Sequence, residues 1–546
     1  MKPLPELPEK KSSGKTKKLP EMPKKELVDL PDKKQNSFKI DIPGAIPAFP
    51  DVEKQKMDFT YPLLPPYASA HIFWDPEAKE LMYEVDEPRL DNEEVRTLSI
   101  LEDGIKELIN ISYLGISEKD SIIEYLEKNI KVLLNELRIK LSQESYLKIM
   151  YYIYRDFVGL GKIEPLMHDY FIEDVECNGT GYPIYIVHRK YRNLKTNIIF
   201  KEVKQLSSFV EKLAERSGQY ISYATPLLDG ALPDGSRVNA TFTEDISSRG
   251  PTFTIRKFTK NPWSPIHLMG FGTISPEVLA YLWMMIEYEK NIMLIGGTAS
   301  GKTTLLNALT FFIPPPARIV SIEDTRELNL EHSNWLPSVA REGVGLANLV
   351  GQKYGEVSLF NLLKESFRQN PDYVIVGEIR GKEAYVLFQG MASGHPSFGT
   401  MHANSVDTMI KRLETEPINL SPSLVETMDV VLVMSSARVG GKQVRRLKEI
   451  VEVISIDDKK GNQLNKPFVW NPAQDSFDYR SESYILKNLV FQQGISEVEL
   501  MSEWKNRTLL LNELYREKII DFHVVQGIIN EYYKDPKKVM SRFKIR

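Results

Sequence analysis

The chain has 546 residues, of which 42% are hydrophobic and 26% charged, a balance typical of soluble globular proteins. At about 150 residues per domain, this length indicates three or four domains. The formal net charge of -4 gives no overall attraction to DNA or anionic lipid, and one cysteine excludes an internal disulfide or a four-cysteine zinc site.

The composition also bears on the single thiol and on the membrane. Cys177, the single cysteine, is best interpreted as a small buried hydrophobe rather than a reactive thiol. No stretch has the roughly 18–20 consecutive apolar residues that a membrane-spanning helix requires, so we expect membrane association only through a partner or a surface.

The first 54 residues are rich in lysine and proline and contain a loose Leu-Pro-acid repeat. Such a segment buries little apolar surface, so the entropy lost on ordering it is not offset. We therefore expect a disordered tail over 1–54, with ordered structure beginning near Tyr61.

Residues 55–158 are expected to form an N-terminal, mostly helical domain. Apolar runs at 68–74 and 81–85 flank an Asp-Pro turn and predict a small β-hairpin. From 93 to 158, apolar residues recur every three or four positions, which predicts several amphipathic helices.

A small α/β domain is expected over 159–260. Its predicted elements are strands at 183–187 and 198–200, a helix at 206–216, and turns at the Asp-Gly pairs 229–230 and 234–235. A proline-containing linker at 261–265 follows.

Residues 261–460 alternate short apolar runs with helical patterns, which is typical of an α/β fold with a buried sheet. The predicted central strands are 292–295, 319–322, 373–376 and 430–434. The last region, 461–546, is polar and then helical from 497 to 543, and it carries no motif that we can connect with chemistry.

The strongest motif is a G-x4-G-K-[ST] phosphate-binding loop between the strand 292–295 and a helix-compatible run at 305–311. Glycines let successive backbone N–H groups face a polyanion, and the following helix adds its positive end. Lys302 would contact the β- and γ-phosphates, and Thr303 a magnesium ion. The candidate nucleotide-binding residues are Gly296, Gly297, Thr298, Ala299, Ser300, Gly301, Lys302, Thr303 and Thr304.

Acidic residues follow two of the predicted strands, at the edge where open α/β sheets bind ligands. Glu323 and Glu327 belong to a cluster after 319–322, which could orient or deprotonate an attacking water or could be an ordinary acidic helix start. Glu378 ends the strand 373–376 in a Walker B arrangement, and its carboxylate would reach magnesium, usually through water.

Two histidines, His395 and His402, lie seven residues apart in a segment rich in glycine and serine that we interpret as a loop. Metal binding is poorly supported, because no third or fourth ligand stands nearby. Sensing or polarising a γ-phosphate is the favoured interpretation.

Together these motifs resemble the type II/type IV secretion ATPases, the superfamily of pilus, secretion and archaellum motors. The resemblance spans about 61–453 and rests on the phosphate loop, "IEDTREL", "NPDYVIVGEIRG" and "GHPSFGTMHA". Segments such as "LPDGSRVNAT" and "FTIRKF" look closest to the archaeal branch. The resemblance implies an α/β fold, with a RecA-like ATPase domain preceded by a small PAS-like domain and the helical N-terminal domain.

The resemblance also implies residue roles. Glu327 would be the general base with Glu323 supporting it, and Glu378 would position magnesium and water. His395 and His402 would couple the γ-phosphate to neighbouring segments.

Arginines from the small domain complete the site in this family. Arg237 and Arg256 match the family's positions, and Arg249 is a weaker match. The resemblance further implies an ATP hydrolase that requires Mg2+ and forms a homo-hexamer in the cytoplasm, at the inner face of the membrane. Its partners would be a polytopic membrane platform protein and, indirectly, pilin-like or archaellin-like subunits.

Two other functions stay open. An ATPase for nucleic-acid translocation or DNA uptake would need a basic channel, and the acidic pI near 6.2 weighs against a nucleic-acid partner. A non-catalytic, nucleotide-gated scaffold is opposed by the presence of Lys302, Glu327 and Glu378 together.

Overall fold

The fold was obtained as a computed structural model and forms two compact units. One unit comprises the described residues up to Asp169 together with Leu194–Ile198, and the other comprises the remainder. The structure describes residues 38–41, 47, 49–50, 52–108, 119–259, 261–341, 343, 354–456 and 461–545.

The first unit combines a small sheet with helices. Strands β1, β2 and β3 are antiparallel, and β3 runs parallel to β6. The predicted hairpin is confirmed, because β2 and β3 pair from Ser69 opposite Asp86 to Asp75 opposite Glu80. The elements are β1 (Asp58–Leu64), β2 (Ala68–Asp75), β3 (Glu80–Asp86), β6 (Arg192–Ile199), α1 (Asn92–Leu108), α2 (Lys119–Glu136), α3 (Gln143–Ile153) and α4 (Glu164–His168).

The predicted disordered tail requires a correction at Phe38. Most of 1–54 lies outside the described residues, but Phe38 is only 3% exposed. Its ring lies 5.3 Å from that of Tyr67, and its backbone N–H donates to Glu127 Oε1 at 3.0 Å. Burying this large aromatic ring releases enough free energy to offset the entropy lost when the chain around it is ordered. The segment is therefore ordered here despite its lysine- and proline-rich composition.

The second unit contains an antiparallel sheet in the order β5-β4-β9-β8-β7, against which α5 packs. The predicted helix at 206–216 and the strands at 183–187 and 198–200 are confirmed, apart from their ends. The elements are β4 (Ile172–Cys177), β5 (Pro183–His188), α5 (Val203–Arg216), β7 (Leu227–Ala231), β8 (Arg237–Thr241) and β9 (Thr252–Arg256).

One turn prediction in this sheet is wrong. Asp229 and Gly230 lie inside β7, where Asp229 pairs with Asn239. The carboxylate of Asp229 accepts two hydrogen bonds from Arg237 on β8, at 3.0 and 2.7 Å, so the cross-strand ion pair holds the strand extended. The second Asp-Gly pair does form a turn, with Gly235 at φ +90°.

Cys177 ends β4 and is buried, as predicted. Burial raises the pKa of its thiol from the ordinary value near 9 to about 11, against a weaker opposing effect of the Gly179 backbone. The thiol is therefore protonated at neutral pH and unsuited to nucleophilic chemistry.

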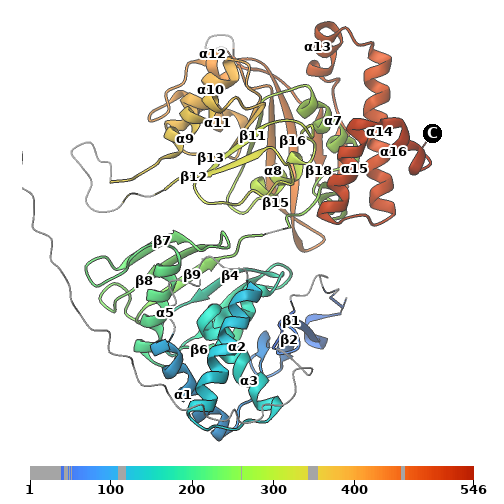
Figure 1. The fold of residues 1–546 in the computed structure, drawn as a ribbon. Coiled ribbons are helices and arrows are strands. Elements are labelled where there is room, and N and C mark those ends of the chain that lie inside the picture. The colour runs from blue at the N-terminus through green and yellow to red at the C-terminus, as the bar shows by residue number, and fades with distance from the viewer. Residues whose placement is uncertain are drawn as a thin grey trace, which may run out of the picture. The chain divides into compact units, whose positions relative to one another are not determined.

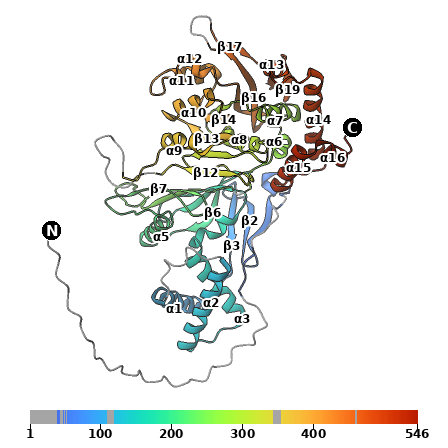
Figure 2. The same cartoon turned by 45° about the horizontal axis from the view of Figure 1, so that its top comes forward.

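A ten-stranded sheet forms the centre of the second unit, in the order β12-β11-β13-β14-β10-β15-β16-β18-β19 with β17 beside β16 (Figure 2). The strands from β12 to β15 along this order are parallel, and β16 returns antiparallel to β15. All four predicted central strands are present, which confirms the α/β class. The strands are β10 (Ile292–Gly296), β11 (Ile319–Glu323), β12 (Trp335–Val339), β13 (Tyr373–Ile379), β14 (Ser397–Met401), β15 (Val430–Val439), β16 (Lys442–Ser455), β17 (Gln463–Asn465), β18 (Phe468–Asn471) and β19 (Ser476–Tyr479).

Helices cover both faces of this sheet (Figure 1). Alternate residues of β10 divide between two buried clusters, Ile292 and Leu294 in one, Met293 and Ile295 in the other. The first cluster includes residues of α6 (Pro265–Gly270), α7 (Pro276–Glu287), α8 (Lys302–Thr310), α13 (Tyr484–Gln493), α14 (Glu497–Arg516), α15 (Phe522–Lys534) and α16 (Pro536–Arg542). The second includes residues of α9 (Leu359–Ser366), α10 (Glu383–Ala392), α11 (Val406–Glu414) and α12 (Pro422–Val425).

The C-terminal region is helical as predicted, and it also contributes strands and α13. Glu452 on β16 is fully buried and fixes this region to the large sheet. It accepts hydrogen bonds from Tyr281 and Asn465 at 2.8 and 2.7 Å, from the backbone N–H of Tyr484 at 2.7 Å, and from the Ser483 hydroxyl. In the part of the chain that the structure describes, no helix is long and apolar enough to cross a membrane.

Candidate functional site

The candidate residues meet at one edge of the large sheet, because four neighbouring parallel strands end there. Strands β11, β13, β14 and β10 are adjacent and in register, with Ile379 and Ile295 both opposite Met401. Their carboxyl ends therefore bring together Glu323, Glu378, His402 and the glycine-rich loop after β10.

The glycines of the loop are required by its geometry. At Gly296, with φ +156°, a Cβ atom would lie 2.6 Å from the carbonyl oxygen of Met434. Gly301 has φ +93° and immediately precedes α8, and Ala299 also has a positive φ of +56°. The sharp turn leaves the first N–H groups of α8 facing the mouth of the loop.

Lys302 opens α8 and is 7% exposed. Its ammonium donates to the carbonyl oxygens of Gly296 and Gly297 at 3.1 and 3.0 Å, and lies 3.4 Å from His402 Nδ1. Burial lowers the pKa of Lys302, while the charges of Glu378 and Glu327 oppose that shift. The structure thus brings Lys302, Glu378 and His402 together, with Glu327 near enough for its charge to act on Lys302.

His402 joins Lys302 to Glu378. Its Nε2 lies 3.0 Å from Glu378 Oε1, and its Nδ1 faces the Lys302 ammonium. Burial, with the nearby charge of Lys302, lowers the pKa of His402. A neutral ring accepts the Lys302 hydrogen bond at Nδ1, while Nε2 lies beside Glu378 Oε1 in a geometry that does not form a hydrogen bond, so His402 lies between a cation and an anion.

Glu378, near the end of β13, carries a second contact that the sequence interpretation did not assign. Arg380 donates from Nη2 to Glu378 Oε2, and its Nη1 lies 3.3 Å from Asp324. The arginine thus joins the carboxyl end of β13 to the acidic cluster after β11. Its position in the motif was visible, but its role depends on how the two strands pair.

Glu323 is buried beneath the acidic cluster and shapes it. Its Oε1 accepts the backbone N–H groups of Glu327 and Leu328 at 3.0 and 2.9 Å, which fixes the loop that carries the exposed Glu327 side chain. Burial raises the pKa of Glu323 from near 4.5 to about 7, although the two backbone N–H groups oppose the shift. Its Oε2 has no hydrogen-bond partner among the described residues.

The prediction that both histidines meet the phosphate group is wrong for His395. The segment interpreted as a loop contains β14, and His395 precedes this strand whereas His402 follows it. A parallel strand puts its two ends at opposite edges of the sheet, so only His402 reaches the loop. His395 instead packs its ring against Phe367, with centroids 5.0 Å apart.

Each candidate arginine contacts a side chain from the same small sheet or from its loops. Arg237 forms the bidentate pair with Asp229 described above, and this pair is the main reason that its pKa is raised. Arg256 Nε donates to Asp174 at 3.1 Å. The guanidinium of Arg249 lies 4.4 Å from the centroid of the Tyr182 ring.

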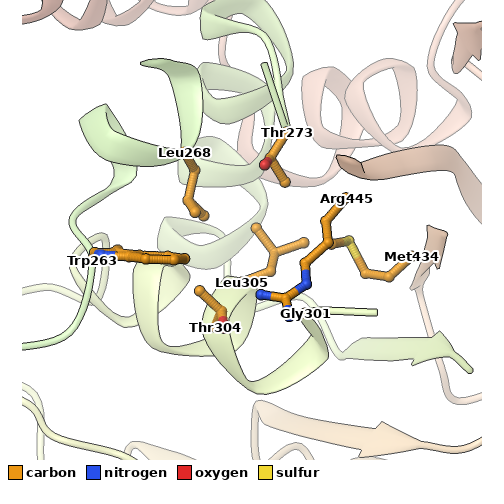
Figure 3. Close-up of a pocket in the computed structure, with 8 residues that line it drawn as sticks. All are labelled: Trp263, Leu268, Thr273, Gly301, Thr304, Leu305, Met434 and Arg445. Carbon is orange, nitrogen blue, oxygen red and sulfur yellow. The ribbon is translucent and has the colours of Figure 1, made fainter. Parts of the chain in front are cut away.

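Two features beside the loop were missed from sequence. Arg445 on β16 donates from Nε to the carbonyl oxygen of Ala299 at 3.0 Å, across 146 positions of chain. A small pocket with a volume of about 20 Å³ also lies against the start of α8 (Figure 3). It is lined by Trp263, Leu268, Thr273, Gly301, Thr304, Leu305, Met434 and Arg445.

The remaining loop side chains fit a polar ligand. Thr303 lies in the first turn of α8 and is partly exposed, and Thr304 lines the pocket. The hydroxyl of Ser300 is buried and has no hydrogen-bond partner among the described residues. Buried hydroxyls are nearly always hydrogen-bonded, so this group is ready to bond an incoming ligand.

Comparisons with known proteins agree with the motif resemblance. The family model described as "Type II/IV secretion system protein" matches residues 158–497, more than half of the chain. An uncharacterized protein of Methanocaldococcus jannaschii is 38% identical over 402 residues, which cover 73% of this chain and 72% of that protein. The type IV secretion system protein PtlH of Bordetella pertussis is 31% identical over 260 residues, 41% of this chain and 74% of PtlH. Among solved structures, the ATPase DotB of Legionella pneumophila is similar with a TM-score of 0.37 at 18% identity, over 62% of this chain and 92% of DotB.

Proposed function

Because this chain belongs to the type II/IV secretion system protein family, we propose that it is an Mg2+-dependent ATP hydrolase that works as a motor. Its work would be the assembly or movement of a type IV pilus-like or archaellum filament, or type II-like secretion. The observation that carries the proposal is the convergence of Lys302, Glu378 and His402 beside a glycine-rich loop that opens a helix.

The loop meets the requirements of a triphosphate. Gly296 leaves no room for a Cβ, and the Ser300 hydroxyl lacks a partner among the described residues. Lys302 bonds carbonyls of its own loop, and phosphate oxygens would accept the same hydrogens. Thr303 and Glu378 would hold magnesium, which when bound supplies positive charge to the phosphate oxygens.

The carboxylates have separate tasks in this proposal. Glu327, exposed at the mouth of the site, takes the proton of the attacking water, and Glu323 holds the backbone N–H of Glu327 so that its side chain stays in place. His402 contacts both Glu378 and Lys302. A shift of either residue caused by the γ-phosphate would therefore be felt by the other.

The active assembly would be a homo-hexamer. The small sheet, β5-β4-β9-β8-β7, would supply Arg237 and Arg256 to a bound nucleotide. If these arginines reach the nucleotide only when the small sheet moves toward it, hydrolysis depends on that movement. The same movement then exerts force on a partner protein. The assembly would work in the cytoplasm, at the inner face of the membrane on a polytopic platform protein, with pilin-like or archaellin-like subunits as its indirect cargo.

ATP turnover by purified protein tests the chemistry. We expect Lys302→Ala and Glu378→Gln each to lower kcat by about 10²-fold or more, because Lys302 would stabilise the negative charge of the transition state and Glu378 would position magnesium and water. Glu378→Gln should still bind ATP. Exposed residues provide matched controls, and Lys364→Ala and Glu426→Gln should keep wild-type turnover.

Undiminished hydrolysis by Lys302→Ala or Glu378→Gln would refute the proposed site. Adding single- or double-stranded DNA separates the motor from a nucleic-acid translocase. We expect turnover to stay unchanged with DNA, and a strong stimulation would favour translocation instead.

A further inference from the structure

Arg445 reaches the phosphate loop from an element that has no other part in the candidate site. It lies on β16, pairs there with Ser436 of β15, and donates from Nε to the carbonyl oxygen of Ala299 at 3.0 Å. Its Cδ would lie 3.4 Å from a Cβ added at Gly301, so the aliphatic stem also packs along the loop (Figure 3). The arginine therefore contacts the loop at two points on either side of Ser300.

The peptide group that Arg445 holds is the one between Ala299 and Ser300. A trans peptide is planar, and its C=O and N–H point in opposite directions. Drawing the Ala299 carbonyl toward Arg445 therefore turns the Ser300 N–H away from it. That N–H donates a long hydrogen bond of 3.4 Å to the Gly297 carbonyl, which also accepts a hydrogen bond from the Lys302 ammonium at 3.0 Å, and a phosphate oxygen would replace this carbonyl as acceptor.

The backbone of Ala299, which carries this peptide group, has a strained conformation. Ala299 has φ +56°, a left-handed conformation that is unfavourable for a residue with a Cβ. A contact is needed to hold it there, and the hydrogen bond from Arg445 is one that the structure provides.

The neighbouring Arg446 shows what a purely structural arginine looks like in the same strand. Arg446 is buried and makes a bidentate pair with Asp475 at 2.8 and 2.9 Å, away from the loop. Arg445 is only partly buried and directs its donor at the loop backbone instead.

We propose that Arg445 is a positioning residue for phosphate binding. By holding the Ala299 carbonyl outward, it keeps the Ser300 N–H directed into the loop, ready to donate to a phosphate oxygen. This inference rests on the proposed function, since it assigns a phosphate ligand to the loop. It adds that the loop is shaped before the ligand arrives, by a residue of the β15–β16 hairpin.

Three substitutions separate the hydrogen bond from the charge. The Nε2 of glutamine is as many bonds from Cβ as the Nε of arginine, so Arg445→Gln keeps a donor at that place without the charge. Arg445→Lys keeps the charge but moves the donor one bond further out. Arg445→Met keeps the stem and has neither, and Arg438→Met on the same hairpin, where Arg438 is exposed, is the matched control.

Steady-state kinetics with Mg-ATP gives the first readout. For Arg445→Met we expect KM to rise about three- to tenfold, the range of one lost hydrogen bond, with kcat within about twofold of wild type. Arg445→Gln should restore most of the affinity, and Arg438→Met should match wild type. Calorimetric titration with inorganic tripolyphosphate and magnesium should give the same order.

Hydrogen exchange of the ligand-free chain gives a readout that needs no nucleotide. Peptides covering 297–303 should exchange faster in Arg445→Met than in wild type, and Arg445→Gln should restore protection. Melting temperatures show whether a variant has lost its fold rather than its loop geometry.

Two outcomes would overturn the assignment. If Arg445→Lys restores affinity and Arg445→Gln does not, the arginine acts through its charge on the phosphates. If loop exchange is the same in Arg445→Met and wild type, it does not position the peptide group. A wild-type chain that binds neither ATP nor tripolyphosphate would instead refute the proposed function, and the exchange of the ligand-free loop would still decide the role of Arg445.

Discussion

At the scale of single residues, Glu323 is a buried acid whose proton matters for stability. Because burial raises its pKa to about 7, the folded chain keeps the proton between pH 4.5 and 7 while the unfolded chain loses it. The stability that the protonated form contributes is therefore complete below pH 4.5 and is lost as the pH rises to 7. The side chain of Glu323→Gln cannot ionise. We therefore expect the melting temperature of the variant to rise relative to that of wild type between pH 5 and 7, and the difference to stay constant above pH 7.

The advantage above pH 7 should correspond to about 1–3 kcal/mol, the cost of ionising a buried carboxyl. Scanning calorimetry at pH 5, 6, 7 and 8 measures it, with the exposed Glu365→Gln as the control. A difference between variant and wild type that does not vary with pH would show that Glu323 ionises normally in the fold.

At the scale of one element, β14 decides which histidine acts. His402 follows the strand beside Lys302 and Glu378, and His395 precedes it beside Phe367. We expect His402→Ala to lower kcat for ATP about 10²-fold, the size of a typical proton-relay or polarising contribution. His395→Ala should leave kcat within about twofold and lower the melting temperature by a few degrees, as loss of an aromatic contact does.

The pair of histidine variants forms its own control, because both remove the same ring from the two ends of one strand. Steady-state turnover and thermal melting should be measured on the same preparations. Equal losses of kcat in both variants would contradict the assignment of His402 alone to the site.

At the scale of the whole molecule, the proposed ring makes a prediction about mixed assemblies. In a ring with head-to-tail contacts, a subunit can give an arginine to its neighbour's nucleotide. Lys302→Ala keeps Arg237, and Arg237→Ala keeps Lys302, so each inactive variant supplies what the other lacks. Random mixing should then restore about a quarter of the wild-type sites.

Co-expression with two affinity tags gives the mixed assemblies, and native mass spectrometry gives the subunit number. A mixture as inactive as its components would place both residues in sites formed within one subunit. A chain that stays monomeric with Mg-ATP would contradict the proposed ring itself.

Much of the fold and part of the site could be predicted because their signals are local. The phosphate loop is a contiguous pattern of glycines with Lys302 and Thr303, and the apolar runs before it and before Glu378 are strands whatever surrounds them. The domain boundaries at 158, 260 and 460 stay predictions, as do the catalytic roles.

What only the tertiary structure decided depends on pairing between distant segments. Asp229, where a turn was expected, lies in a strand and forms an ion pair with Arg237 of the neighbouring strand, and Phe38 is ordered because a core accepts its ring. His395 lies away from the phosphate loop because of the direction of β14. Arg445 contacts the loop although it is 146 positions from Ala299 along the chain. The sequence by itself determined that a polyanion site exists here and which loop forms it. The strand register decided which side chains surround that loop, because a contact between distant residues leaves no trace in local pattern.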